Sequence, residues 1–230
     1  MNIGGFQKTS LLDFPDTLSA IVWTNDCNFR CPFCYNKNLV LDQTESIPEK
    51  EVFKFLEKRK GMLEGLVISG GEPFLQEELG DFIKKAKDLG YLIKVDTNGS
   101  LPDKIKQLVD KNLIDYISMD VKAPKNKYNQ ISGVDVKISK IEKSIDLIRN
   151  NVLEYEFRTT FVPQILKKED IIEIGKWLEG SEKYYLQQFR NNPPLISTEY
   201  NNVAPYSKEY IIETLESIKP FYKFCDIRGI

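Results

Sequence analysis

The chain of 230 residues is short enough for one domain, and we expect a core over about residues 18–190 with a C-terminal extension over 191–230. Acidic and basic side chains nearly cancel to a net charge of −2, and no long basic tract indicates a nucleic-acid footprint. No apolar run approaches the roughly 20 residues that cross a bilayer, and no secretory signal opens the chain. We therefore expect a cytoplasmic protein that binds neither nucleic acid nor membrane.

Strand-like and helical patterns alternate along the first half of the chain. Runs rich in β-branched and apolar residues predict four strands, at Ser19–Thr24, Gly65–Ser69, Leu92–Asp96 and Tyr116–Asp120. The segments between them have apolar residues at helical spacing, as in Leu79, Phe82, Ile83 and Ala86. Pro48 and Glu49 resemble a helix start, and Pro102 opens another helix. This alternation is typical of an α/β fold.

The second half continues the alternation after a polar loop over residues 121–137. Isoleucines at helical spacing predict a helix from Ile138, followed by a strand at Glu154–Phe161, a helix at Asp170–Leu178 and a strand at Lys183–Phe189. Residues 190–206 read as irregular, and Ser207 is suited to cap a last helix. Six strand–helix pairs predict a mainly parallel sheet with right-handed crossovers, either doubly wound or closed toward a barrel.

Three closely spaced cysteines follow the first predicted strand. Cys27, Cys31 and Cys34 have the spacing Cys-x3-Cys-x2-Cys, which suits an iron–sulfur cluster, a zinc knuckle or plain buried thiols. A zinc knuckle needs a fourth ligand, but the chain has no histidine, and its other cysteine, Cys225, is far away in sequence. The spacing therefore favours a cluster. Three thiolates would leave one iron of a cubane without a protein ligand, and we expect Cys225 to be a buried thiol.

Polar motifs also end the next three predicted strands. They are Gly70-Gly71-Glu72-Pro73, Asp96-Thr97-Asn98-Gly99 and Asp120-Val121-Lys122. Such residues often form ordinary turns. In a barrel of parallel strands, however, the carboxyl ends converge on the face where active sites are built. Arg158 lies within a predicted strand, where an unpaired cation would be costly.

Together these motifs resemble the radical S-adenosylmethionine (SAM) superfamily. The resemblance is carried by the cysteine run, by the strand Ala20–Thr24 before it and by Ser69–Pro73 after it. The opening segment Gly4–Pro15 and the run Cys27–Cys34 are similar to the activating proteins of anaerobic ribonucleoside-triphosphate reductases, relatives of the pyruvate formate-lyase activating enzymes. The resemblance implies a partial (β/α)6 barrel, a [4Fe-4S] cluster and SAM. It also implies a glycyl radical protein as partner, with flavodoxin or ferredoxin as electron donor.

The resemblance also assigns roles to residues. It implies that Cys27, Cys31 and Cys34 bind the cluster, and that the cofactor-binding set comprises Phe33, Gly70, Gly71, Glu72, Asp96, Thr97, Asn98, Asp120, Lys122 and Arg158. Two members keep alternatives: Phe33 either shields the cofactors or packs in the core, and Arg158 pairs with the SAM carboxylate or with a structural acid. No side chain is expected to act as a general base, since the chemistry belongs to the cofactors.

Three residues depart from the family pattern. Family members usually have His where Tyr35 stands, and commonly have Gly at the positions of Asp26 and Asp16.

Three alternative functions stand beside this assignment. The first alternative is an activase of another glycyl radical enzyme, of the formate-lyase type. The second is a radical SAM enzyme acting on a small molecule or nucleoside, and the third is a metal-binding module without catalysis.

Overall fold

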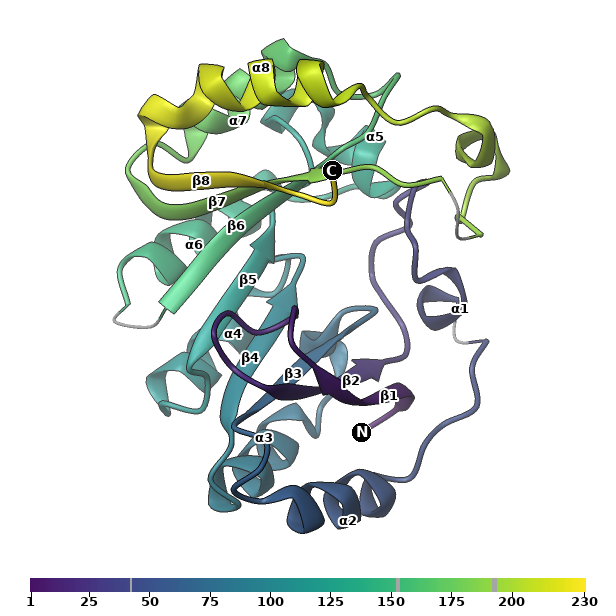
Figure 1. Cartoon of the computed structure of the whole chain (residues 1–230), viewed down its shortest axis with the longest axis vertical. Helices are drawn as coiled ribbons and strands as arrows, with labels where there is room; N and C mark the ends of the chain where they lie inside the picture. The colour runs from purple at the N-terminus through teal and green to yellow at the C-terminus, as the bar shows by residue number, and fades with distance from the viewer. Residues whose placement is uncertain (42, 152–153, 192–193) are drawn as a thin grey trace.

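One curved sheet of eight strands organises the protein (Figure 1). The structure, a computed structural model, describes residues 1–41, 43–151, 154–191 and 194–230. The strands pair in sequence order, and β1 is antiparallel to β2 while all later neighbours are parallel. The strands are β1 (Ile3–Ser10), β2 (Ser19–Thr24), β3 (Gly65–Gly70), β4 (Leu92–Thr97), β5 (Tyr116–Asp120), β6 (Glu154–Phe161), β7 (Ser181–Gln188) and β8 (Tyr222–Arg228).

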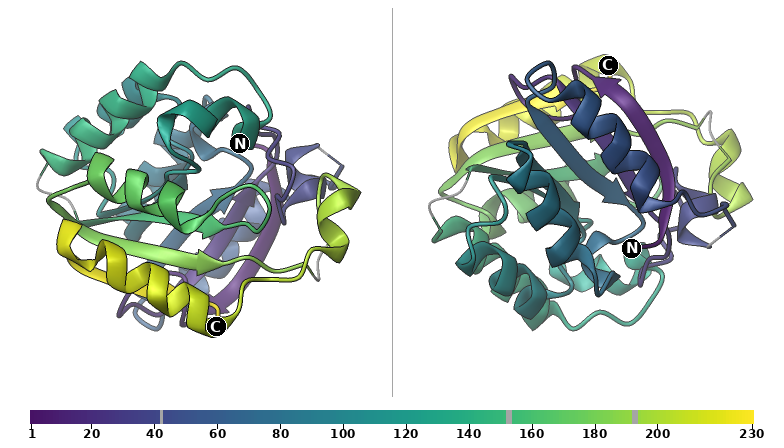
Figure 2. Two further views of the ribbon diagram at one scale, coloured as in Figure 1. Left: turned by 90° about the horizontal axis from the view of Figure 1, so that it is seen from above. Right: turned by 90° about the horizontal axis from the view of Figure 1, so that it is seen from below.

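The helices cover the outer side of the curved sheet, as the two views of Figure 2 show. They are α1 (Lys37–Val40), α2 (Glu49–Arg59), α3 (Leu79–Asp88), α4 (Pro102–Asp110), α5 (Tyr128–Ser132), α6 (Ile138–Arg149), α7 (Lys168–Trp177) and α8 (Lys208–Ile218). A helix follows each of the strands β2 to β7, which gives the six strand–helix units of a partial (β/α)6 barrel. Within the described ranges, no helix is long and apolar enough to cross a membrane.

The six predicted strands are confirmed as β2 to β7, with ends that differ by at most two residues. The predicted cap is also confirmed, because the Ser207 side chain accepts a hydrogen bond from the Tyr210 backbone N–H at the start of α8. The sequence interpretation missed β1, β8 and the two short helices α1 and α5. β1 contains two glycines, β8 alternates apolar with charged residues as edge strands do, and α5 is a single short turn of helix inside a polar loop.

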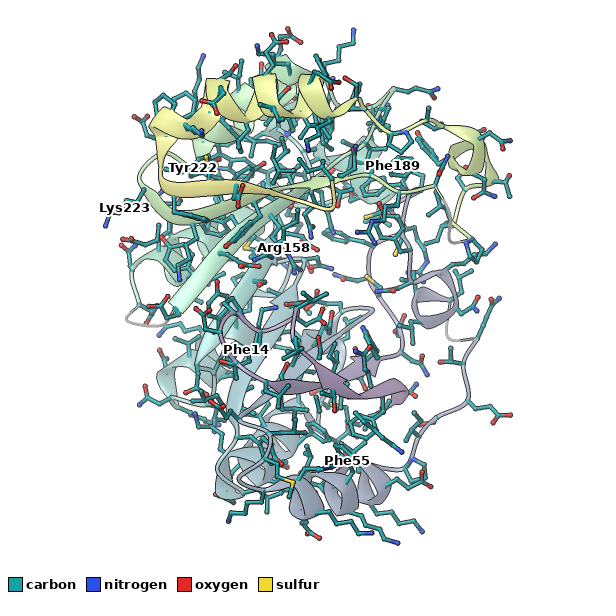
Figure 3. All side chains as sticks on the ribbon, in the orientation of Figure 1. Phe14, Phe55, Arg158, Phe189, Tyr222 and Lys223 are labelled. Carbon is teal, nitrogen blue, oxygen red and sulfur yellow. The ribbon has the colours of Figure 1, made fainter. Side chains whose placement is uncertain are left out.

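Apolar side chains form a large core between the sheet and the helices, and a small one inside the barrel. On α3 the buried residues are Leu79, Phe82, Ile83 and Ala86, the set that the helical spacing predicts. The small interior cluster consists of Phe14, Ile21, Val67 and Tyr116, with Trp23 packed against it. Figure 3 shows Phe14 and Arg158 on the concave side of the sheet. The interior is therefore apolar at Phe14 but charged at Arg158.

We expect Leu66→Ala to lower the free energy of unfolding by about 2–5 kcal/mol, because it leaves a cavity in the large core. Leu66 lies on β3 and is fully buried. Leu92→Ala, at the exposed start of the adjacent β4, is the matched control and should cost less than about 1 kcal/mol. Urea denaturation measures the free energy of unfolding of both variants. An equal loss of this free energy in the two variants would contradict this description of the core.

Candidate functional site

The cysteine loop connects β2 to α1 at the carboxyl end of the sheet. Cys27 and Cys31 are buried and Cys34 is partly exposed, whereas Asn28 and Arg30 are exposed residues. The loop begins at Asp26, whose φ of +70° is left-handed, and Asp16 also has a positive φ of +53°. Glycine is favoured at such positions and aspartate is tolerated, so both departures from the family pattern preserve the backbone shape.

Hydrogen bonds from four separate segments hold the cysteine loop. The Glu72 N–H donates to the Asp26 carbonyl at 2.8 Å, and the Arg30 N–H donates to the Ser132 carbonyl at 2.7 Å. The amide of Asn98 donates to the Asn28 side chain at 2.9 Å. On the far side, Ser197 N–H donates to the Pro32 carbonyl at 2.8 Å. The loop contains no helix or strand of its own, so these neighbours determine where the cysteines lie.

Two glycines, Gly70 at the end of β3 and Gly71 directly after it, are required by close packing against this loop. A Cβ at Gly71 would lie 1.7 Å from the Asp26 carbonyl oxygen, and one at Gly70 would lie 2.3 Å from the Thr24 backbone nitrogen. Gly70 also has a φ of +120°, which side chains other than hydrogen rarely allow. The Gly-Gly pair thus lets the turn after β3 contact the loop after β2 backbone to backbone.

Glu72 has a structural position that the sequence interpretation did not anticipate. Its side chain is 1% exposed and accepts hydrogen bonds from the Thr97 hydroxyl at 2.8 Å, the Asn98 N–H at 2.7 Å and the Phe74 N–H at 3.2 Å. Burial raises the pKa of this carboxyl to about 7, although these donors oppose the shift. The Glu72 carboxylate therefore ties the end of β3 to the end of β4.

Arg158 is the centre of a charged wall built from β4, β5 and β6. Its Nε donates to the Asp120 carboxylate at 2.9 Å, and its Nη1 lies 3.5 Å from the Asp96 carboxylate. Each carboxylate has a second cation, Lys122 at 2.8 Å from Asp120 and the buried Lys94 beside Asp96. Burial alone would raise the pKa of Asp120, but the facing guanidinium overrides it and lowers the pKa to about 2. Arg158 thus pairs with structural acids, one of the two alternatives left open for it.

A third carboxylate joins this wall to the last strand. Glu156 is fully buried and receives a two-pronged contact from Arg228, at 2.6 and 2.8 Å. The hydroxyls of Tyr116 and Ser118 also donate to Glu156, at 3.0 and 2.7 Å. Arg228 in turn covers the ring of Tyr185 at 3.4 Å from its centroid. The two contacts between Arg228 and Glu156 fix the end of β8 against the barrel interior.

The loop and the wall enclose one cavity of about 520 Å³. All the residues that the sequence predicts for the site line this cavity except Glu72. Phe33 lines it while also packing in the core, so the core-packing alternative is observed and the shielding of the cofactors stays a prediction. Residues that carried no assignment also line it, among them Tyr35, Asn36, Thr160, Gln187, Gln188, Arg190, Arg228 and Gly229. Most of these lie at the ends of β6, β7 and β8, where no recognisable motif marks them.

The donor set fits a cluster better than a single ion. Among the described residues, no three Cys, His, Asp or Glu side chains are close enough to hold one metal ion. A cubane instead takes one thiolate for each ligated iron, and three cysteines line this cavity. Burial raises the pKa of Cys27 to about 12 and of Cys31 to about 11, so these thiols stay neutral until cationic iron offsets the cost of the thiolate.

An incomplete α/β barrel with three cysteines at the carboxyl end of its first parallel strand defines a class of enzyme that holds a cluster with an open iron. The model of the radical SAM superfamily matches residues 21–178 of this sequence. The chain therefore belongs to the radical SAM superfamily, whose members use a [4Fe-4S] cluster and SAM. The radical SAM identification, the two cofactors and the partial barrel predicted from the sequence are thus confirmed.

Among curated proteins, the chain is similar to one from Methanocaldococcus jannaschii that is provisionally named a glycyl-radical enzyme activating enzyme. The two are 34% identical over 226 residues, which cover 96% of this chain and 92% of the relative. The alignment with this relative is longer than the match of the superfamily model, which ends at residue 178, before β7 and β8.

Two solved structures show the same fold. SuiB of Streptococcus suis, bound to the precursor peptide SuiA, superposes with a TM-score of 0.68 over 91% of this chain at 16% identity. This chain spans about half the length of SuiB, 48%. A domain of pyruvate-formate lyase-activating enzyme from Bacteroides vulgatus gives a TM-score of 0.57 at 18% identity, over 72% of this chain and 99% of that domain.

We expect Gly71→Ala to reduce the iron and sulfide content after anaerobic reconstitution by more than half. The added methyl group would displace the Asp26 carbonyl and with it the cysteine loop. Gly80→Ala on α3, where a Cβ would meet only the flexible tip of Leu108 at 3.3 Å, is the control and should load normally. Full loading of Gly71→Ala, by iron and sulfide analysis, would show that the loop does not depend on this packing.

Replacing Cys27, Cys31 or Cys34 with Ala should abolish SAM cleavage and lower the iron content, because we expect each thiolate to ligate a different iron. Cys225 is partly exposed, so the expectation of a buried thiol is wrong; it lies on the edge strand β8, where little covers it. Cys225→Ala should keep about four irons and four sulfides per chain, since Cys225 is not among the cavity residues. Iron analysis and 5′-deoxyadenosine release measure these effects. SAM cleavage at the normal rate by Cys31→Ala would refute the ligand assignment.

Proposed function

We propose that this protein activates an anaerobic ribonucleoside-triphosphate reductase by producing a glycyl radical on it. The observation that carries the proposal is the cavity itself, which brings the three cysteines together with the charged wall of Arg158. The M. jannaschii relative, named as an activating enzyme and aligned over nearly the whole chain, supports the activase class. The resemblance of Gly4–Pro15 to reductase activases supports the reductase as the target.

The cofactors supply the radical chemistry, and the chain supplies their environment. When the cluster and SAM are bound, one-electron reduction of the sulfonium releases methionine and a 5′-deoxyadenosyl radical, which removes a hydrogen from a glycine Cα of the partner. Cys27, Cys31 and Cys34 hold the cluster. We assign the adjacent turns at Gly70–Gly71 and Asp96–Asn98 to SAM, since they line the same cavity. Glu72 acts indirectly there, by fixing the backbone of both turns.

The charge of the wall suits an amino-acid ligand. Lys94, Lys122, Arg158 and Arg228 bring four cations to three carboxylates, those of Asp96, Asp120 and Glu156. A partly buried excess of positive charge favours an anion, and SAM carries a carboxylate. Lys122 and Arg158 both line the cavity and are placed to face that group.

A protein substrate fits the open edge of the sheet. Within the described residues the end strands β1 and β8 do not pair with each other, so the barrel wall is incomplete between them. A glycine-bearing loop of the partner could approach the cavity there. We assign the electron donor to flavodoxin or ferredoxin, and the reaction to the cytoplasm of an anaerobic host, because oxygen destroys an exposed three-ligand cluster.

The test is anaerobic incubation of the reduced, reconstituted protein with SAM and the cognate reductase. Electron paramagnetic resonance should show a doublet, which arises from the single Cα hydrogen left on the target glycine. A reductase with that glycine changed to Ala should give no signal, and Cys31→Ala of the activase should give none with the native reductase. No radical on the reductase, together with a radical on a formate-lyase-type protein or a modified nucleoside, would overturn the reductase assignment.

A further inference from the structure

Glu156 of β6 is a fully buried carboxylate that lies between two arginines of the barrel interior. Arg228, from the last strand, donates to both of its oxygens, at 2.6 and 2.8 Å. Arg158 is the other cation within ion-pair distance in the described part of the chain, with its Nη1 4.0 Å from Oε1. Burial alone would raise the pKa of Glu156, but the hydrogen bonds from Arg228 and the charges of both guanidinium groups lower it to about 2. The carboxylate is therefore ionised.

The Nη1 atom of Arg158 lies between two carboxylates at similar distances. It is 3.5 Å from Asp96 and 4.0 Å from Glu156. Both distances exceed the roughly 2.7–2.9 Å of a strong charge-assisted hydrogen bond. The Nε of the same guanidinium is held more closely, by Asp120 at 2.9 Å. The guanidinium can therefore turn about this fixed Nε toward whichever carboxylate attracts Nη1 more strongly.

Arg228 decides this competition because it satisfies Glu156. The two oxygens of a carboxylate offer about four acceptor sites. Arg228 donates two hydrogen bonds to them, and the hydroxyls of Tyr116 and Ser118 donate one each. Without Arg228 only the two hydroxyls would remain, and a buried charge that has lost its ionic partner is costly. The nearest cation left would be Arg158, so its Nη1 should move to Glu156 and away from its present position.

Arg228 is itself held in the orientation that this contact needs. Its backbone pairs with Gln187 of β7, and its guanidinium lies over the Tyr185 ring, 3.4 Å from the ring centroid. Stacking on an aromatic face fixes the plane of a guanidinium group. The superfamily model ends at residue 178, so this contact comes from a part of the chain that lies beyond that match.

We propose that Arg228 is a positioning residue for SAM, which neutralises Glu156 and thereby keeps the Arg158 guanidinium facing the SAM carboxylate. This inference rests on the proposed function, because that function assigns Arg158 to the carboxylate. Both arginines line the cavity, but Arg228 acts through Arg158. The last strand must consequently be in place before Arg158 has the orientation that binds SAM.

The test measures the SAM affinity of cluster-loaded variants by anaerobic titration calorimetry, with iron and sulfide content measured on the same samples. Arg228→Gln should weaken SAM binding about tenfold and still load about four irons and four sulfides. Adding Glu156→Gln should restore the affinity to within about twofold of the parent, since no carboxylate remains to draw Arg158 away. Arg59→Gln, at the exposed end of α2, is the matched control and should change neither quantity.

A second set of variants shows whether Arg228 acts through Arg158. Arg158→Gln should weaken SAM binding at least as much as Arg228→Gln, and combining the two should have no further effect, because both remove the same contact. A crystal structure of Arg228→Gln should show Nη1 of Arg158 within hydrogen-bond distance of Glu156. Should Arg228→Gln fail to fold, Arg228→Lys takes its place. It keeps the charge without the two-pronged geometry, and we expect a weakening of about threefold that Glu156→Gln removes.

The outcomes separate this inference from the proposed function. Parent affinity in Arg228→Gln would overturn the inference, and so would a weakening that comes with loss of iron. An equal weakening with and without Glu156→Gln would also overturn it, since that result is expected if Arg228 binds SAM directly. Normal SAM affinity in Arg158→Gln would show that the proposed function places Arg158 wrongly, and the inference would fall with it. The expected affinities, together with a reductase that gains no radical, would uphold the inference and overturn the reductase assignment alone.

Discussion

The site depends on one backbone contact, that of the turn after β3 with the loop after β2. The cysteine loop has no regular structure to define its shape, and the Asp26 carbonyl meets the Glu72 N–H where only hydrogen fits on Gly71. This contact brings the cysteines beside the SAM-binding turn that we propose. The Glu72 carboxylate then extends the same tie to β4 through Thr97 and Asn98. Three strand ends are thereby fixed relative to one another by short hydrogen bonds.

In the barrel interior, charged side chains occupy much of the space that apolar side chains fill in a closed barrel. In a closed barrel, layers of branched apolar side chains fill the centre, whereas here that packing is confined to the small cluster around Phe14 and Tyr116. Beyond it, Asp96, Asp120 and Glu156 each contact two cations. Buried ion pairs of this kind often contribute little to stability, since desolvation offsets the attraction. Their benefit lies in holding Arg158 and Lys122 at the cavity wall in fixed orientations.

Strand patterns and strand-end motifs were enough to predict β2 to β7 and most of the cavity residues. Parallel strands place their carboxyl ends together whatever lies between them, so Cys27, Gly70, Asp96 and Asp120 could be grouped from the sequence alone. The role of Glu72 as a tie could not be predicted, because its carboxylate meets the Thr97 hydroxyl and the Asn98 N–H, which are 25 and 26 residues away.

Arg228 was likewise out of reach of sequence reasoning. Arg228 lies on an edge strand whose alternation of apolar and charged residues is weak as a strand signal, and its partner Glu156 is 72 residues away. Such features arise from tertiary packing, and no local pattern encodes them.

The strand order has a consequence for how the protein is made. Because each strand pairs with the next one along the chain, the sheet can grow during synthesis from β1 onward. The cysteine loop emerges from the ribosome early, yet Ser197, Arg190 and Arg228, which cover or wall it, come from the final segments. A nascent chain therefore exposes its three thiols throughout most of translation. Cluster assembly has its widest access in that interval, before β8 docks and completes the cavity.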